Sequence, residues 1–304
     1  MSEKDTNKKA LEFLANRDWH SAQKLLFENA SRYKSHNSYN NLGYYLVTEG
    51  MICKDGKFLN TYNLGMKYLL KAAQIKDSAT NAFAIASALN YKIRNSSSQK
   101  KTEICDEAIK WLKKGLSIKN SKEMRYNLLR FLYLTDPKRE ELIRLSEDVV
   151  KDFLCEESIS LRLEILRTNR QKVAGLECIE KHRELLDEID LLMFYTTVGL
   201  YEMGFALCES VCLKFSIDKY IASAMIECCV KTNHLNEAEI YASVIQENDS
   251  YVQYEGKKNW CSKVFGDSSR TKNYRQKMIS DYCITPPFIT ECCYFGCDMH
   301  NTPW

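Results

Sequence analysis

Apolar residues recur along most of the chain at the three- and four-residue spacing of amphipathic helices. The pattern is an apolar helix, a short polar break and then an amphipathic second helix. Clear second helices are predicted from Cys105 (CDEAIKWLKKGLSI) and from Asn233 (NHLNEAEIYASVIQ). In each, small residues such as Ala108 and Ala238 let a neighbouring helix approach closely. The pattern therefore predicts an all-α chain built from helix pairs.

The pairs recur with a period in the thirties to forties. One anchor residue in each second helix gives the series Ala22, Met66, Ala108, Leu142, Leu176, Ala206 and Ala238. A single pair cannot bury its own apolar stripe, so neighbouring pairs must stack. We expect a right-handed α-solenoid of about seven helix pairs over residues 1–247, followed by an irregular Cys-rich extension over residues 248–304.

The segment YNNLGYYL resembles the first-helix signature of tetratricopeptide repeats. Its aromatic, Leu-Gly and large apolar positions are filled by Tyr39, Leu42, Gly43 and Leu46. The segments RDWHSAQKLLFENA and HLNEAEIYASVI resemble the second helix of that family, with alanine at its small position. The similarity extends loosely over residues 6–247, although only one pair carries the Leu-Gly dipeptide.

The resemblance implies a concave surface, lined by first helices, that holds a peptide or a partner protein. The residues that it places on this surface are Asn40, Tyr44, Asn81, Asn127 and Phe131. Asparagine suits such a surface because its amide can both donate to and accept from an extended backbone. The alternative interpretation, to which we give equal weight, is that these are ordinary solvated helix residues.

The composition narrows the class of protein. The chain has 304 residues with only 11 Gly and 4 Pro, which favours long helices over a turn-rich β fold. Its net charge of +3, from 43 basic and 40 acidic residues, gives no electrostatic case for nucleic acid or an anionic membrane. The longest apolar stretch, residues 191–201, is too short to span a bilayer. The N-terminal MSEKDTNKK lacks the apolar core of a signal peptide, so we expect a cytoplasmic protein with reduced thiols.

No catalytic motif stands out. The sequence has no glycine-rich phosphate loop, no HExxH and no nucleophile elbow, and its five histidines are scattered. We therefore expect a non-catalytic scaffold that binds a protein or peptide and needs no cofactor.

The C-terminal stretch ECCYFGCDMHNTPW is unlike the rest of the chain. It combines Cys292, Cys293, Cys297 and His300, with Cys283 a little upstream, and these side chains could share zinc or copper(I). Structural zinc sites usually use two separated pairs of ligands, so the crowding of these residues weakens that prediction.

Three interpretations of this stretch stay open. It could cap the end of the helical repeats, alone or as a metal knuckle. It could instead be a displayed peptide that a modifying enzyme acts on, which would make the helical domain its carrier. The third interpretation is a reactive Cys293 or Cys297 with His300 as base, which lacks an orienting group and ranks last.

Overall fold

The computed structural model describes residues 2–49, 52–54, 57–59, 61–94, 98–248 and 269–297. The fold is all-α, and its contacts divide the chain into two compact units. Unit 1 comprises Met1–Asp136 together with Phe288–Trp304, and unit 2 comprises Pro137–Pro287. The boundary predicted at residue 247 lies at the edge of a stretch outside the described residues and stays a prediction.

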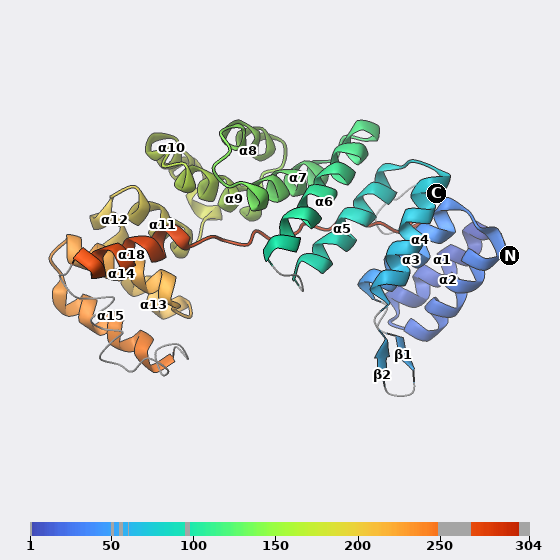
Figure 1. The fold of residues 1–304 in the computed structure, drawn as a ribbon, viewed down its shortest axis with the longest axis horizontal. Coiled ribbons are helices and arrows are strands. Elements are labelled where there is room, and N and C mark those ends of the chain that lie inside the picture. Colours follow the sequence, from blue (N-terminus) through green and yellow to red (C-terminus); the bar gives the residue numbers. More distant parts are fainter. Residues whose placement is uncertain are drawn as a thin grey trace. The chain divides into compact units, whose positions relative to one another are not determined.

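Unit 1 consists of consecutive helices that pack on their neighbours (Figure 1). Its elements are α1 Glu3–Ala15, α2 Trp19–Tyr33, α3 His36–Thr48, β1 Ile52–Lys54, β2 Lys57–Leu59, α4 Tyr62–Ile75, α5 Ala79–Arg94, α6 Ser98–Ile118 and α7 Lys122–Thr135. The stretch between α3 and α4 contains the antiparallel hairpin β1–β2, in which Ile52 lies opposite Leu59. One core cluster of unit 1 brings together α1, α2, α3 and α4 through Ala10, Leu26, Leu42 and Ala72.

The first helices of unit 1 share a start signal. Ser2, Ser35 and Ser121 cap α1, α3 and α7 respectively, each by accepting a hydrogen bond from a backbone N–H of the first turn. An asparagine follows each cap five or six residues later, at Asn7, at Asn40 and Asn41, and at Asn127. The asparagines of α1, α3 and α7 therefore lie at similar distances from the N-terminus of their helix.

Two glycines bring α3 and α4 into close contact. A Cβ added at Gly43 would lie 2.8 Å from the backbone nitrogen of Leu69 and 2.9 Å from the carbonyl oxygen of Gly65. A Cβ at Gly65 would lie 2.8 Å from the carbonyl oxygen of Gly43. The Leu-Gly dipeptide singled out in the sequence is thus half of a glycine–glycine contact.

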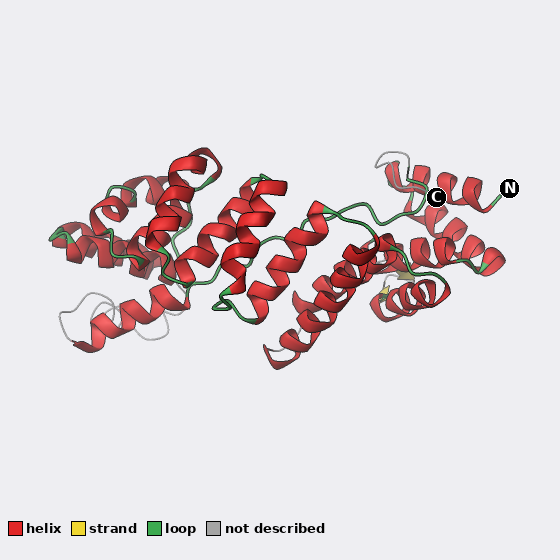
Figure 2. Cartoon of the chain, turned by 90° about the horizontal axis from the view of Figure 1, so that it is seen from above, coloured by secondary structure: helices red, strands yellow, loops and turns green. Residues whose placement is uncertain are grey.

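Unit 2 is also helical. Its elements are α8 Glu141–Asp152, α9 Glu156–Thr168, α10 Lys172–His182, the short 3-10 helix η1 Arg183–Leu185, α11 Glu188–Thr197, α12 Tyr201–Phe205, α13 Cys208–Lys214, α14 Lys219–Lys231, α15 Leu235–Asn248 and α18 Ser269–Asp281. The last helix within the described residues is α18. Residues 282–297, which follow it, form no helix or strand (Figure 2).

One turn geometry recurs between paired helices. Arg17, Arg170 and Asn233 have φ of 60°, 53° and 62°, and Gly199 has φ of 77°. The N–H of the residue after each of them donates to a carbonyl five residues earlier, as in Asp18 to Phe13 and Gln171 to Leu166. This is the Schellman arrangement, which ends a helix and reverses the chain within a few residues. The same reversal thus joins α1 to α2, α9 to α10, α11 to α12, and α14 to α15.

Helix α18 packs on α14 and is held by a buried ion pair. The guanidinium of Arg275 lies 2.8 Å from the carboxylate of Glu227, and both side chains are 5% exposed or less. Arg167 of α9 pairs with Glu164 at 2.7 Å and also donates to the carbonyl oxygens of Ile279 and Tyr282. These contacts fix both faces of α18 within unit 2.

Candidate functional site

An extended stretch of the chain, residues 288–297, packs against the first helices of unit 1. We call it the docking segment, and we call the side chains of α3, α5, α7 and the α6–α7 turn that contact it the docking face. Cys293, Phe295 and Cys297 are buried, whereas Cys292, Tyr294 and Gly296 between them are partly exposed. This alternation is that of an extended chain with one side against a surface.

Two asparagines bind the backbone of the docking segment in both directions. The side chain of Asn41 donates to the carbonyl oxygen of Phe295 at 3.0 Å, and its Oδ1 accepts from the N–H of the same residue at 2.8 Å. Asn127 pairs in the same way with Ile289, at 2.7 Å and 3.1 Å. Each amide therefore satisfies both main-chain polar groups of one residue, as a neighbouring β-strand would.

A third asparagine binds one carbonyl. Asn40 donates to the carbonyl oxygen of Cys293 at 2.6 Å, and its Oδ1 accepts from the side chain of Asn81 at 2.7 Å. Asn81 is itself held by Ser78, whose hydroxyl donates to Asn81 Oδ1 at 2.8 Å. The chain Ser78–Asn81–Asn40 therefore orients the amide that binds Cys293.

The spacing of the backbone contacts matches an extended chain. Ile289, Cys293 and Phe295 differ by even numbers, so their main-chain groups point to the same side of the segment. Six residues of extended chain span roughly 20 Å, which corresponds to about two helix-to-helix steps of 8–10 Å. The distance between the asparagines of α7 and α3 thus matches the distance between Ile289 and Phe295 in an extended docking segment.

The start of the docking segment fits between two aromatic rings. Phe288 stacks on Phe83 of α5 with ring centres 5.5 Å apart, and lies 6.1 Å from Phe131 of α7. The guanidinium of Arg130 lies 5.8 Å from the centre of the Phe288 ring. At this end of the docking face, a flat apolar ring therefore packs against two aromatic rings and a guanidinium.

The far end also uses aromatic contacts. Tyr294 meets Tyr44 of α3 edge-on, with ring centres 5.0 Å apart, and Phe295 meets His36 edge-on at 5.3 Å. Burial raises the pKa of the Tyr44 hydroxyl, of the Tyr294 hydroxyl and of the Cys293 thiol. These groups therefore stay neutral at ordinary pH while the segment is docked.

The centre of the docking segment carries a carboxylate. Glu291 accepts from the hydroxyl of Ser121 at 3.1 Å, and its other oxygen lies 3.7 Å from the ammonium of Lys119. Ser121 is also the N-cap of α7, where its hydroxyl oxygen accepts a hydrogen bond from the N–H of Met124. The same hydroxyl therefore contacts both the start of α7 and the docking segment.

The structure brings together the five residues that the tetratricopeptide resemblance placed on a binding surface. Asn40, Tyr44, Asn127 and Phe131 contact the docking segment, and Asn81 acts through Asn40. Whether they bind a partner stays a prediction. Sequence reasoning missed Asn41, Phe83 and Ser121, although the asparagine pair and the serine cap were visible signals.

The predicted Cys and His cluster is only partly described. Cys283 is exposed, Cys292 is partly exposed, and Cys293 and Cys297 are buried. His300 lies outside the described residues. Within the described ranges, no group of three or more His, Cys, Asp or Glu side chains could hold a metal ion. The zinc or copper site stays a prediction, as does modification, for which buried Cys293 and Cys297 would first have to leave the docking face.

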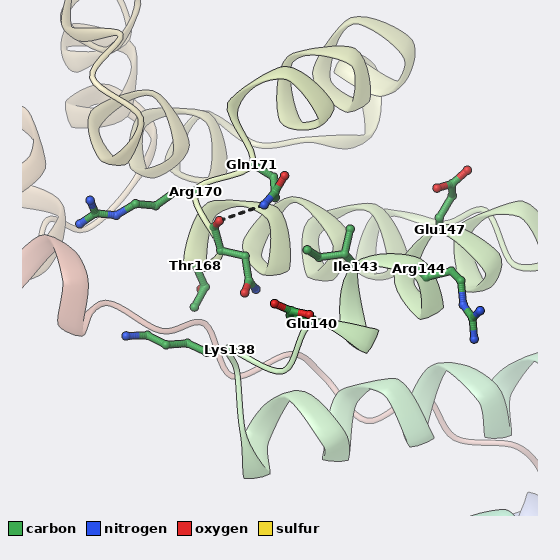
Figure 3. Close-up of a pocket in the computed structure, with 9 residues that line it drawn as sticks. Lys138, Glu140, Ile143, Arg144, Glu147, Thr168, Arg170 and Gln171 are labelled. Carbon is green, nitrogen blue, oxygen red and sulfur yellow. Dashed lines mark hydrogen bonds between the residues drawn. The ribbon is translucent and has the colours of Figure 1, made fainter.

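Unit 2 has two hollows of its own. One, beside α8 and α9, is lined by Lys138, Arg144 and Arg170 and by Glu140 and Glu147, and Figure 3 shows Arg170 and Arg144 at opposite ends of it. Its three basic and two acidic side chains are of mixed sign and spread apart, which favours an ordinary solvated surface.

The other hollow lies between α9 and α11 and is acidic. Its carboxylates come from Glu156, Glu157, Glu184, Asp187 and Asp190. Burial, together with the neighbouring Asp187, raises the pKa of Asp190 to about 7.

None of the helices in the described ranges combines the length and apolar character needed to cross a membrane. Comparison with protein-family models and with curated protein sequences finds no match for the chain.

Proposed function

We propose that unit 1 is a peptide-binding module of the tetratricopeptide type in a non-catalytic scaffold protein. The observation that carries the proposal is the pairing of Asn41 and Asn127 with both main-chain groups of Phe295 and Ile289. Such pairing needs an extended backbone in register but no particular side chain there. A surface that holds one extended segment in this way is suited to hold another.

The finer architecture belongs to the same proposal. We infer a right-handed α-solenoid of about seven tetratricopeptide-like pairs. The recurring Schellman turns support it, because they join helices in both units with one geometry. The serine caps followed by asparagines support it within unit 1.

The partner that fits this surface is a protein or peptide segment in extended form. The balanced charge of the chain gives no reason to invoke nucleic acid, a membrane or a cofactor. The cytoplasm, where tail thiols stay reduced, is the compartment that suits the proposal.

Panning of a displayed peptide library tests this function. The bait is the full chain with Phe288→Ala and Phe295→Ala, which weaken the docking segment; we call it the released variant. We expect enriched peptides that lose at least tenfold in affinity when Asn41→Ala and Asn127→Ala are added, because several backbone hydrogen bonds of about 1 kcal/mol each are removed. The proposal is contradicted if no peptide is enriched, or if the enriched peptides keep their affinity when both asparagines are replaced.

A carrier function is the second candidate, and the exposed thiol of Cys283 is the observation that favours it. In this hypothesis the Cys-rich stretch 283–304 is the substrate of a modifying enzyme or a metal-binding segment. Intact mass of the protein from its native host, followed by the mass and metal content of its C-terminal fragment, decides it. A mass shift confined to 283–304 supports the carrier, and an unmodified, metal-free fragment contradicts it.

A further inference from the structure

The docking face contacts the side chains of the docking segment as well as its backbone. Its first subsite is the aromatic pair Phe83 and Phe131, which holds the ring of Phe288. Truncation of that ring would remove both contacts and leave two aromatic faces of the docking face without a neighbour. An aromatic residue is therefore the side chain that this subsite takes.

The second subsite lies three residues further along and takes a carboxylate. Lys119 supplies a positive charge to Glu291, whose side chain is 30% exposed. The hydroxyl of Ser121 lies within hydrogen-bond distance of the carboxylates of both Glu291 and Glu123 and donates to one of them at a time. An ion pair at this exposure contributes little affinity, but it disfavours a basic side chain at the same place. The subsite thus adds specificity more than strength.

The third subsite accommodates two successive aromatic rings. Tyr44 receives Tyr294 and His36 receives Phe295, while Asn41 fixes the backbone of the second ring. Between the subsites, Thr290 is exposed and Cys292 is partly exposed, so those positions are free to vary.

Resting on the proposed function, we infer that the partner of unit 1 is an extended protein segment with an aromatic residue, a carboxylate three residues later, and an aromatic pair starting three residues after that. The docking segment, with Phe288, Glu291, Tyr294 and Phe295 in this pattern, is the resident occupant that the partner displaces. The docking face is therefore regulated by competition between a tethered segment and a free one.

Tethering sets the strength of this competition. A segment in the same chain as its site acts as though present at an effective concentration that depends on the connection between them, which here consists of unit 2. A free segment of equal intrinsic affinity must reach a similar concentration to displace it. A natural partner must then either bind more tightly than the docking segment or be presented at high local concentration.

The first test measures the pattern. The probe is a fluorescent synthetic peptide of residues 286–297 with each cysteine replaced by alanine, and its matched control is a scrambled peptide of the same composition. Both are titrated by anisotropy against the released variant. The expected result is binding of the patterned peptide alone, at least tenfold weaker with Phe288→Ala in the peptide. Glu291→Gln should weaken the peptide less than about fivefold, and only at low salt.

The outcomes separate this inference from the proposed function. Equal binding of patterned and scrambled peptides overturns the pattern but leaves a peptide-binding face. Binding of neither peptide overturns the pattern alone if library panning yields asparagine-dependent peptides. Binding of neither peptide overturns both proposals if panning also yields nothing.

The second test measures displacement in the unaltered chain. Iodoacetamide alkylation of Cys293, which is buried under the docked segment, is compared by mass spectrometry with alkylation of exposed Cys283. The patterned peptide should raise the Cys293 rate while the Cys283 rate stays constant, and it should require a higher concentration than on the released variant. The competition is refuted if the peptide binds both proteins equally and leaves the Cys293 rate unchanged.

Discussion

Asn81 donates from its side chain to Oδ1 of Asn40 at 2.7 Å, and this bond determines which way the Asn40 amide faces. Within the described residues, Asn81 reaches the docking segment through Asn40, so a change at Asn81 should affect docking. In Asn81→Asp the bond from Ser78 is kept, whereas a carboxylate oxygen faces Asn40 Oδ1. We expect the docking segment to open roughly 5- to 30-fold more often, which corresponds to about 1–2 kcal/mol.

Hydrogen exchange of residues 288–297, together with the alkylation rate of Cys293, measures this opening. Asn63→Asp is the control because it makes the same change at an exposed residue of unit 1, in α4, which is not part of the docking face. Equal exchange in both variants would show that Asn81 does not orient Asn40.

Gly43→Ala should destabilise unit 1. The added methyl group would meet backbone atoms of Leu69 and Gly65 at under 3 Å, and backbone cannot move aside without shifting α4. Overpacking of this kind costs about 1–3 kcal/mol, against a gain in helix propensity of about 1 kcal/mol. We expect a net loss of up to roughly 2 kcal/mol in the free energy of unfolding, measured in urea by hydrogen exchange in α3 and α4.

Gly115→Ala is the matched control for this prediction. Its methyl group would lie 2.9 Å from the sulfur of Met124, a flexible thioether that can move, and 3.2 Å from the Cβ of Ala82, whereas its three nearest atoms include no backbone atom. We expect this variant to stay within about 1 kcal/mol of the natural chain. If the two alanines destabilise unit 1 equally, the glycine–glycine contact does not explain Gly43.

The stability of unit 2 should depend on the protonation of Asp190. Its pKa is raised from 3.8 to about 7, chiefly by burial and then by Asp187 and Glu164, against an opposing effect of Arg167. The folded state therefore binds more protons than the unfolded state between these two pH values, so the free energy of unfolding falls as pH rises from about 4 to about 7. In Asp190→Asn this fall should be smaller, and the variant should gain most relative to the natural chain above pH 7.

Urea unfolding of unit 2 at several pH values, followed by exchange in α9 and α11, checks this prediction. The exposed Asp148 provides the control variant Asp148→Asn. A constant difference between Asp190→Asn and the natural chain from pH 4 to pH 8 would be the contrary result.

Arg275→Leu should detach α18 from α14. Among the described residues, it leaves the buried carboxylate of Glu227 with Lys231 as its remaining ionic partner, whose ammonium is 4.0 Å away. Removal of one partner of a buried ion pair typically costs about 3–5 kcal/mol. Adding Glu227→Gln should recover much of this loss, because no buried charge then lacks its main partner.

The surface pair Lys151–Glu147, at 2.9 Å with both side chains about half exposed, is the comparison. Lys151→Leu should cost less than about 1 kcal/mol. Exchange rates in α18 report the result, and an Arg275→Leu effect as small as that of Lys151→Leu would refute the role of the buried pair.

The helical class followed from the sequence because its signals are local. Periodic apolar residues mark the helices, and the Leu42-Gly43 dipeptide marks a close helix contact whose partner, Gly65, lies only one helix away. The same local register placed Asn40 and Asn127 on one face. That register also contains Asn41, which was passed over because the family pattern assigns the neighbouring position.

The occupant of that face was beyond sequence reasoning. Phe295 and its binding residue Asn41 are separated by 254 positions, and nothing local to either residue encodes their contact. The Cys-rich stretch is unusual in sequence for its thiols and aromatic rings, but its backbone makes the hydrogen bonds to the docking face. Every residue has the same backbone groups, so amino-acid composition cannot reveal these contacts. Phe83 was missed for a related reason, since an apolar residue on a first helix also suits a core.

The docking face is synthesised before the docking segment that covers it. The helices that form the docking face, α3 to α7, are complete at residue 135, whereas the segment that covers them begins at residue 288. At roughly 5–20 residues per second, a ribosome needs roughly 8–30 s to make the chain between them. During that interval the nascent chain has the helices of the docking face but not yet the docking segment. A partner that is already present can therefore bind the docking face without competition from that segment.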